Sequence, residues 1–481
     1  MKLKDLIREG EYVSCELDFE TEVVNITSES TLINSGTLFV IPNSNKIPDF
    51  KINPLAVLCA NDAEIPEGIP TVRAKEIRRL ISFVYFRFYG IKVGKMKMIA
   101  VTGTNGKTTT ASFIEKILTY TGNRVGFIGT GKIAIGDRVL SGENYSMTTP
   151  DPELLYRVLS LMQNDGCEAV VMEASSHALA LDKLAPLEFD YGVFTNLSSE
   201  HLDFHPSKEE YFLAKKKLFQ KCKCAVLNID DPYARRLSED FNGRVIRAGV
   251  LWRGDIYATQ IENTPPDGLK YLYHGRNFIF FMRLQTSGIY NVYNSLLASA
   301  VCIDMGIKPK DAKIALSEIP FVEGRFEIIK DRVTVIIDYA HTDSAFESVM
   351  KNLSAMKHEQ NRLTVLFGCG GERDRQKRPK MASIAEKYAD RVIVTSDNSR
   401  GEDPMSIISD ITLGFTKENY EIIENRREAI IHAVTTANDG DIVALIGKGA
   451  EKYNIDSNGY SHFDEKEIAS FALSLGASKA L

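Results

Sequence analysis

Short apolar runs recur along most of the chain, separated by longer stretches that mix apolar and polar positions. Continuous apolar runs of this kind are typical of strands covered on both faces, and their alternation with helical stretches predicts an α/β protein with mostly parallel sheets. The runs that carry this pattern are Met96–Val101, Val125–Ile128, Ala169–Met172, Tyr191–Phe194, Val333–Ile337, Leu363–Phe367, Val392–Val394 and Ile442–Ile446.

The stretch after the first of these runs shows the helical part of the pattern. Ile114, Ile117 and Leu118 recur at the spacing of one helix face, and Gly122 follows at a suitable place for a helix C-terminus. We therefore expect a strand, a glycine turn and a helix, in that order, between residues 96 and 122.

The residues before this region have a different pattern. Thr37–Ile41 and Leu55–Cys59 are short apolar runs set among turn-forming clusters such as PNSNKIPD, which predicts a small mixed α/β unit. At roughly 150 residues per domain, a chain of 481 residues has room for about three domains. We place them at residues 1–92, 93–321 and 322–481.

Composition and charge exclude several classes of protein. A chain that is 44% hydrophobic and 25% charged is neither disordered nor collagen-like. The net charge of −6 argues against a nucleic-acid partner. The seven scattered cysteines form no disulfide framework, the N-terminal segment MKLKDLIREGEY is not a signal peptide, and no apolar stretch could span a membrane. We therefore expect a cytoplasmic protein without membrane insertion.

The strongest motif is VTGTNGKTTT at Val101–Thr110, between a predicted strand and a predicted helix. Gly103 and Gly106 let the backbone turn tightly around phosphates at the helix N-terminus. Lys107 would reach the β- and γ-phosphates of a nucleotide, and the Thr108 hydroxyl would ligate Mg²⁺. Only two residues separate the glycines, fewer than the four of the general phosphate-loop pattern, and no NKxD word is present, so a GTPase is not indicated.

The last four apolar runs are each followed at once by a polar or glycine-rich word. The words are DYAH, GCGGERDR, TSDNSR and GKGAEKY. Because ligands of open α/β sheets bind outside the carboxyl ends of the strands, we expect these loops to build one site.

Ten words of the chain, in order, resemble those of the Mur ligases, and within them the MurE type. The words are TTPD (148–151), MEASSHAL (172–179), FTNLSSEHLDFH (194–205), YFLAKKKLF (211–219), NVYN (291–294), EGRFE (323–327), DYAHT (338–342), GCGGERDR (368–375), DNSR (397–400) and GKGAE (447–451). The resemblance implies a P-loop-type central domain with a mostly parallel sheet, a Rossmann-like C-terminal domain and an N-terminal domain that binds a UDP-sugar.

The resemblance further implies an ATP-dependent amide ligase of peptidoglycan synthesis. Such an enzyme phosphorylates a carboxylate of UDP-N-acetylmuramoyl-L-alanyl-D-glutamate, and an amine then attacks the acyl phosphate. The ATP contacts implied by position are Gly103, Thr104, Asn105, Gly106, Lys107, Thr108, Thr109, Asn291, Asn294, Arg325 and Asp338.

The resemblance also implies a catalytic group of Lys107, Glu173, His201 and Lys215. Two Mg²⁺ sites would use Thr108, Glu173, His201 and Lys215, the last as a carbamate formed with CO₂. Residue type alone predicts otherwise for two of them, because a lone histidine is more often structural and a lysine in the run KKK usually lies on a solvated helix face.

Two further sets of residues would bind the other substrates. For the UDP-muramoyl dipeptide they are Ser28, Thr148, Thr149, Ser175 and Lys183. For the incoming amino acid they are Arg373, Asp397, Asn398, Arg400, Gly447 and Glu451. Lys183 stands where the family usually has arginine, and the first domain lacks the family's glycine-rich and Asp-Gly words.

The added amino acid is predicted from the word DNSR, which resembles DNPR of the members that add meso-diaminopimelate. Arg400 would hold the distal carboxylate of that substrate with its planar fork of donors. Ser399 and Ala450 depart from the family's proline and histidine, so L-lysine stays as the second choice.

Two other functions remain as alternatives. One is a Mur-family ligase with another acceptor, such as a folylpolyglutamate-like or secondary-metabolite amide ligase. The other is a non-catalytic nucleotide-binding paralogue, which we would expect to have lost Lys107, Glu173, His201 or Lys215, whereas all four are present. We expect the protein to be a monomer.

Overall fold

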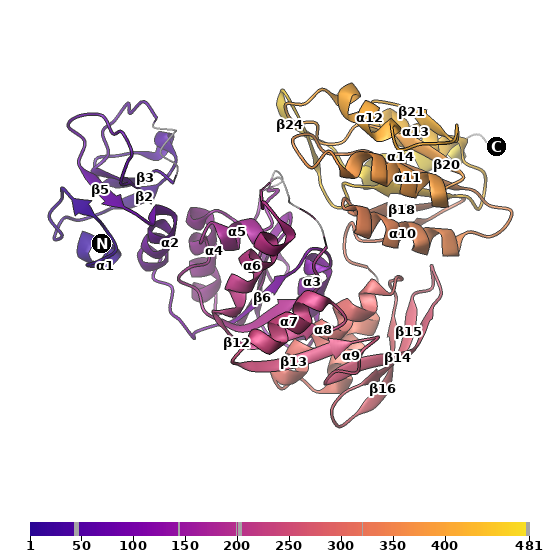
Figure 1. Cartoon of the computed structure of the whole chain (residues 1–481), viewed down its shortest axis with the longest axis horizontal. Helices are drawn as coiled ribbons and strands as arrows, with labels where there is room; N and C mark the ends of the chain where they lie inside the picture. Colours follow the sequence, from indigo (N-terminus) through magenta and orange to yellow (C-terminus); the bar gives the residue numbers. More distant parts are fainter. Residues whose placement is uncertain (43–47, 143–144, 199, 201–203, 320, 478–481) are drawn as a thin grey trace.

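The computed structural model describes residues 1–42, 48–142, 145–198, 200, 204–319 and 321–477. These residues form three principal sheets with helices packed against them, arranged in chain order as an N-terminal, a central and a C-terminal part (Figure 1). The predicted three-part α/β fold is confirmed. The exact domain bounds remain predictions.

The N-terminal sheet has five described strands, and all run parallel except the edge strand β1. In spatial order they are β1 (Ser14–Cys15), β5 (Thr71–Ala74), β4 (Ala56–Ala60), β3 (Thr37–Val40) and β2 (Asn25–Thr27). The two apolar runs expected here are β3 and β4. The remaining elements are α1 (Leu3–Leu6), the short 3₁₀ helix η1 (Ser30–Leu32) and α2 (Ile77–Phe88).

The central sheet has eleven described strands in the order β16-β15-β14-β13-β12-β11-β6-β10-β7-β8-β9. The strands from β14 to β7 in this order run parallel, and antiparallel strands extend the sheet at both edges. Their bounds are β6 (Lys97–Thr102), β7 (Val125–Gly129), β8 (Lys132–Ile135), β9 (Arg138–Val139), β10 (Ala169–Glu173), β11 (Phe189–Phe194), β12 (Cys222–Asn228), β13 (Arg244–Gly249), β14 (Ile256–Asn263), β15 (Leu269–His274) and β16 (Ile279–Leu284).

Helices cover both faces of the central sheet. They are α3 (Lys107–Tyr120), α4 (Pro152–Asn164), α5 (Ser176–Ala180), α6 (Lys208–Phe219), α7 (Pro232–Asp240), α8 (Tyr290–Asp304) and α9 (Pro309–Glu318). Alternate residues of β6 point into different cores, Met98 and Ala100 into one and Ile99 and Val101 into the other, so the strand is apolar throughout.

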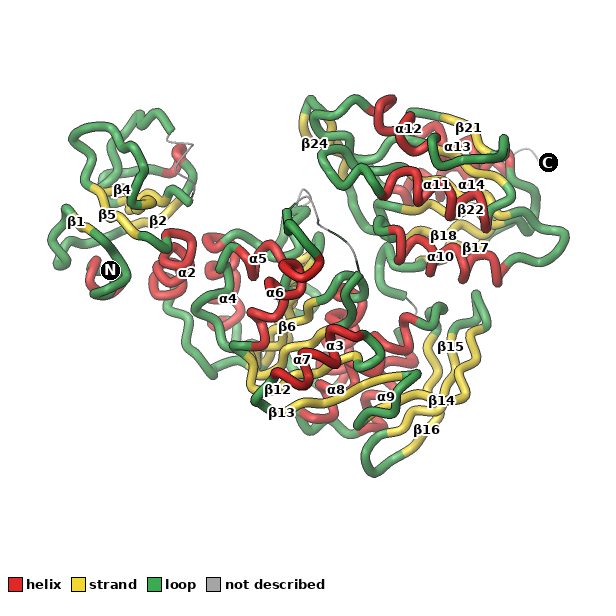
Figure 2. The backbone as a smooth tube through the Cα atoms, viewed as in Figure 1, coloured by secondary structure: helices red, strands yellow, loops and turns green. Residues whose placement is uncertain are grey.

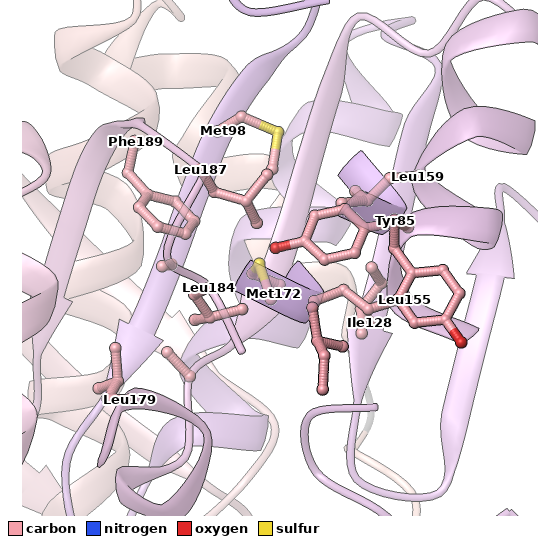
Figure 3. Packing of buried hydrophobic residues seen from close by; sticks show 14 of the residues in the cluster. Tyr85, Met98, Ile128, Leu155, Leu159, Met172, Leu179, Leu184, Leu187 and Phe189 are labelled. Carbon is pink, nitrogen blue, oxygen red and sulfur yellow. The ribbon is translucent and has the colours of Figure 1, made fainter. Parts of the chain in front are cut away.

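The core on the α4 side also fixes the N-terminal part. Tyr85 of α2 packs beside Leu155 and Leu159 of α4, and this layer lies over Met172 of β10 (Figure 3). The helix that follows the N-terminal sheet therefore shares its core with the central sheet, which holds the two parts together through buried apolar side chains.

The C-terminal sheet has six described strands, parallel except for the edge strand β17. In spatial order they are β17 (Glu327–Lys330), β18 (Thr334–Asp338), β22 (Ile442–Ile446), β19 (Leu363–Phe367), β20 (Arg391–Val394) and β21 (Tyr420–Ile422). The other elements are α10 (Asp343–Met356), α11 (Lys377–Tyr388), α12 (Pro404–Thr412), α13 (Arg426–Thr436), α14 (Glu465–Ala477) and the hairpin β23 (Tyr453–Asp456) and β24 (Gly459–His462).

All eight strands predicted from apolar runs after residue 95 are present, and the predicted helix is α3. Gly122 follows its C-terminus with φ of +86°, as expected for a left-handed cap. The extension β14–β16 was not predicted, because its strands alternate between buried and exposed positions instead of forming continuous runs. It reaches toward the C-terminal part (Figure 2), where Asn263 donates to Asn352 of α10 at 2.8 Å.

Strand order decides which loops can meet. β6 lies between β10 and β11, so Val101 pairs with Glu173 and Thr102 pairs with Phe194 at the carboxyl ends of these strands. No helix among the described residues is long and apolar enough to cross a membrane.

Candidate functional site

The loop between β6 and α3 has a backbone conformation that favours glycine at two positions. Gly103 has φ of +145°, and a Cβ atom there would overlap Oγ1 of Thr195. Gly106 has φ of +84°, and a Cβ atom would lie 2.5 Å from Oδ1 of Asn294. The loop can therefore close against β11 and α8 only because both residues lack a side chain.

Hydrogen bonds fix the rest of this loop. The amide of Asn105 donates to Asn196 Oδ1 at 3.0 Å, and the amide of Thr104 donates to the Asn196 carbonyl at 2.8 Å. Lys107 Nζ donates to the carbonyls of Gly103 and Thr104 at 3.0 and 2.7 Å. Burial lowers the pKa of Lys107. The loop thus places a lysine at the N-terminus of α3, and helix N-termini are suited to binding phosphate groups.

A buried carboxylate faces the start of α3. Glu173, the last residue of β10, is fully buried, and it accepts from Thr108 Oγ1 at 3.1 Å and from the amide of Thr130 at 2.8 Å. Carboxylate and hydroxyl oxygens are the donors that Mg²⁺ prefers. The predicted ligand His201 lies outside the described residues.

Lys215 lies beneath the same loop and not on a solvated face. Its side chain on α6 is 1% exposed, its Nζ donates to the Gly103 carbonyl at 2.8 Å, and it sits 4.3 Å from the centre of the Tyr211 ring. Burial, and secondly the neighbouring Lys107, lowers the pKa of Lys215 well below its ordinary value. The surface position expected from residue type alone is therefore wrong.

The C-terminal part also contributes residues to this site. Arg325 Nη2 donates to Thr108 Oγ1 at 3.2 Å, and the Arg325 guanidinium lies 4.1 Å from the Tyr339 ring centre. His341 Nε2 and Glu200 Oε1 are 2.8 Å apart. Residues of the central part and of the C-terminal part line one cavity of about 770 Å³. The loops after β6, β10 and β18 are thus brought into a single site.

The residues predicted for the base and ribose of ATP line this cavity too. Asn294 of α8 accepts from Thr110 Oγ1 at 3.2 Å and donates to Asn291 Oδ1 at 3.0 Å, so both amides are held in place. Asp338 accepts from the amides of Phe326 and Ala340 at 2.7 Å each, and burial raises its pKa.

A second cluster forms where β20 and β22 end in the C-terminal part. Asn398 donates to Glu451 Oε2 at 2.8 Å, and fully buried Lys448 donates to Asn398 Oδ1 at 2.8 Å. Burial alone would raise the pKa of Asp397, but Lys448 and Arg426 hold it at about 2. Burial raises the pKa of Glu451.

Two arginines border this second cluster. Arg400 has φ of +54° and donates through Nη1 to the carbonyls of Gly371 and Asn398 at 2.9 and 3.1 Å. Arg373 donates to the Glu372 carbonyl at 3.1 Å. Gly447 has φ of +124°, and a Cβ atom there would come within 3.0 Å of Asp397 Oδ2. Five of the six predicted acceptor residues, Asp397, Asn398, Arg400, Gly447 and Glu451, meet here, joined by backbone contacts or hydrogen bonds.

The residues predicted for the muramoyl substrate divide into two groups. Thr149 Oγ1 donates to the Glu173 carbonyl at 2.8 Å and accepts from the amide of Ser175 at 3.0 Å, and Thr148 lies 3.0 Å from Thr130 through their hydroxyls. These three substrate residues adjoin the phosphate-loop cavity. Ser28 and Lys183 do not line it.

Comparisons with known proteins agree with this architecture. The model of the Mur ligase middle domain matches residues 101–302, and that of the Mur ligase glutamate ligase domain matches residues 324–449. The chain is 36% identical to a UDP-N-acetylmuramoyl-L-alanyl-D-glutamate–2,6-diaminopimelate ligase of Clostridium acetobutylicum, over 98% of each chain. The chain belongs to the Mur ligase family.

Other relatives are similar to this Mur ligase in sequence and in fold. A protein of the same name from Caldanaerobacter subterraneus subsp. tengcongensis is 40% identical over 86% of each chain. A solved structure of a diaminopimelate ligase superposes with a TM-score of 0.66 at 26% identity over 99% of each chain. Folylpolyglutamate synthase of Mycobacterium tuberculosis, at 17% identity, shares the fold with a TM-score of 0.61 over 73% of this chain and 88% of its own.

Family membership confirms the predicted ATP-dependent formation of a carbon–nitrogen bond. Sequence reasoning did not single out Thr130, Asn196, Glu200 and His341, which line the cavity or hold its loop. Glu200 and His341 stand inside the words SSEHLDFH and DYAHT, so position within a motif could have indicated them. For Thr130 the only signal in the sequence was its position shortly after a predicted strand.

The loop geometry predicts the effect of one added methyl group. Gly103→Ala should weaken ATP binding about tenfold or more, because a strained φ of roughly 1–3 kcal/mol adds to the clash with Thr195. Calorimetric titration with ATP measures this. Gly122→Ala is the matched control, since φ is also positive there but nothing lies within 4 Å of the added Cβ. Unchanged ATP affinity in Gly103→Ala would contradict the assigned role of the loop.

Proposed function

We propose that this Mur ligase adds meso-diaminopimelate to UDP-N-acetylmuramoyl-L-alanyl-D-glutamate during peptidoglycan synthesis in the cytoplasm. The observation that carries the proposal is the near full-length similarity to ligases of that name, at 36% identity over 98% of the chain. The paired clusters at Lys107 and at Asn398 support it, because one suits a nucleotide triphosphate and the other suits an amino acid.

The proposed reaction has two steps, and the first uses the cluster at Lys107 and the second the cluster at Asn398. A carboxylate of the dipeptide's glutamate attacks the γ-phosphorus of ATP, which forms an acyl phosphate and releases ADP. The amine of the acceptor then attacks the carbonyl carbon, the carbon–oxygen bond to phosphate breaks, and the amine loses a proton as the amide forms. Lys107 and Arg325 offset the charge that develops on the transferred phosphoryl group, since Lys107 is the first residue of α3 and Arg325 contacts Thr108 beside it.

The residues present fit Mg²⁺. Thr108 and Glu173 supply hard oxygen donors in contact with each other, and Glu173 has no cationic partner among its described hydrogen bonds. A second ion would use Lys215 as a carbamate, together with His201, which lies outside the described residues. Bound Mg²⁺ supplies neutralisation of phosphate charge.

Lys215 also fits the carbamate proposal. Carbamate formation consumes a neutral amine, and burial lowers the pKa of Lys215 well below its ordinary value. The reaction with CO₂ forms a nitrogen–carbon bond, releases one proton and replaces a buried amine with an anionic oxygen donor. Such a donor would lie beside Lys107, which favours it electrostatically.

Arrangement of the acceptor cluster favours an amino acid with a second carboxylate. Asn398 and Glu451 present amide and carboxylate groups to an ammonium, whereas Arg400 offers guanidinium donors to a carboxylate. L-Lysine has no second carboxylate and would leave Arg400 without its substrate partner.

ATP turnover tests the proposed reaction. Purified protein with ATP, Mg²⁺ and UDP-muramoyl dipeptide should release ADP and phosphate when meso-diaminopimelate is added, at a rate well above that with L-lysine or with no amino acid. Chromatography of the UDP-muramoyl tripeptide measures the product. ADP release that does not depend on a diamino acid would contradict the proposal, and product formed with L-lysine alone would replace the assigned acceptor.

The role of Arg400 predicts a selective loss. Arg400→Lys should raise KM for meso-diaminopimelate by about 10- to 100-fold while KM for ATP stays unchanged, because lysine loses a charged bidentate contact of roughly 1.5–3 kcal/mol. Steady-state kinetics measure both constants. Arg427→Lys, an exposed change of the same kind on α13, serves as the control. Equal KM for the acceptor in variant and wild type would refute the contact.

The proposed carbamate on Lys215 predicts that activity lost on replacing this lysine can be partly restored by added carboxylates. Lys215→Ala should lower kcat by about 100-fold or more, because a charged group beside the phosphates is lost and such a group lowers the activation free energy by several kcal/mol. Excess bicarbonate or acetate should restore part of the rate by supplying a free carboxylate. Lys216→Ala, which removes a neighbouring lysine paired with Asp240 at 2.6 Å, should keep full activity. Full activity in Lys215→Ala would remove the carbamate from the mechanism.

A further inference from the structure

The first turn of α4 contacts the part of the N-terminal domain that is proposed to bind the UDP-sugar. Glu153 lies in that turn, and its carboxylate accepts hydrogen bonds from donors on three residues. Thr27 Oγ1 donates at 3.1 Å, the amide and hydroxyl of Ser28 donate at 3.1 and 3.3 Å, and the Tyr85 hydroxyl donates at 3.0 Å. One carboxylate therefore gathers polar groups from the end of β2 and from α2.

These donors form a cradle suited to an anionic oxygen. Thr27 is 1% exposed, and Tyr85 is buried in the core shared with α4. Burial and the adjacent Glu153 raise the pKa of Tyr85, so its hydroxyl keeps the proton that it donates. Hydrogen bonds from such groups to an ionised oxygen are about twice as strong as neutral ones. The cradle is thus ordered around a negative charge that the protein supplies itself.

A second carboxylate of the same segment pairs with Lys183, which is also proposed to bind the substrate. Asp151, two residues before Glu153, holds Lys183 Nζ at 2.6 Å. Ser28 and Lys183 come from different parts of the chain, yet carboxylates from one segment contact both. An anionic substrate would compete with these carboxylates, because the donors are already used and like charges placed side by side repel.

We propose that Glu153 sets the affinity of the nucleotide-sugar site. Its carboxylate occupies the donors of Thr27, Ser28 and Tyr85 in the free protein and leaves them when the diphosphate of the UDP-sugar binds. Glu153 is half-buried, so its carboxylate can turn into solvent, where it stays near the N-terminus of α4 and the favourable helix dipole. The inference rests on the proposed function for the identity of the ligand.

Direct binding without ATP tests this inference. Calorimetric titration of the full chain with UDP-N-acetylmuramoyl-L-alanyl-D-glutamate should give a Kd about three- to tenfold lower for Glu153→Gln than for wild type, because one competing charge is gone. The gain should shrink as salt rises from about 50 mM to about 500 mM, since screening weakens charge repulsion. Glu428→Gln, the same change in the exposed first turn of α13, should leave Kd unchanged.

A double variant separates competition from a general structural effect. In a Ser28→Ala background the gain from Glu153→Gln should become smaller, because one donor for which substrate and Glu153 compete is absent. Equal or weaker binding by Glu153→Gln, or a gain that does not change with salt, would overturn the inference while leaving the proposed function intact. A wild-type chain that does not bind this nucleotide would contradict the proposed function itself.

Discussion

A half-buried lysine and a buried one share one carbonyl oxygen, and much of the candidate site depends on that contact. Lys107 from α3 and Lys215 from α6 both donate to the Gly103 carbonyl, at 3.0 and 2.8 Å. Two ammonium groups so close together would repel each other and be poorly solvated. Burial lowers the pKa of both lysines, and Lys107 lowers that of Lys215 further. The surrounding site offsets this with Glu173 and Glu200, and a polyphosphate would offset it further. The loop is therefore electrostatically incomplete until an anion binds.

That constraint explains why the loop is held so tightly from every side. Asn196 after β11 fixes its amides, Asn294 of α8 packs against Gly106, and Glu173 at the end of β10 holds the first turn of α3 through Thr108. Each of these elements adjoins β6 or α3, so the sheet order itself assembles the supports. Arg325 adds a cation from the C-terminal part, so both parts contribute to the proposed phosphate site.

Much of this arrangement could be predicted from the sequence, for a physical reason. Parallel strands covered on both faces are continuous apolar runs, and the residues that follow them gather at one edge, so the runs predicted which loops could meet. The four loops expected to build one site divide between two clusters, because the loop after β18 lines the phosphate-loop cavity and those after β19, β20 and β22 form the second cluster. The half-exposed strands β14–β16 lack that signal. The burial of Lys215 could not be read from residue type either, because KKK looks the same whether one lysine faces a loop or water. Only its place within a longer motif distinguished it from Lys216.

The N-terminal domain shows where motif reading stops and geometry becomes necessary. Its words depart from those of the family, yet Ser28 lies at the end of β2 with its amide and hydroxyl directed at Glu153. Glu153 stands 125 residues away in sequence and belongs to no motif that we recognised. A contact of that kind depends on α2 packing against α4, a tertiary event decided by buried apolar residues such as Tyr85 and Leu155. In the proposed scheme the affinity of the nucleotide-sugar site is thus linked to the packing of two helices, and a change at Leu155, which contacts no proposed ligand group, would alter nucleotide-sugar binding through that packing.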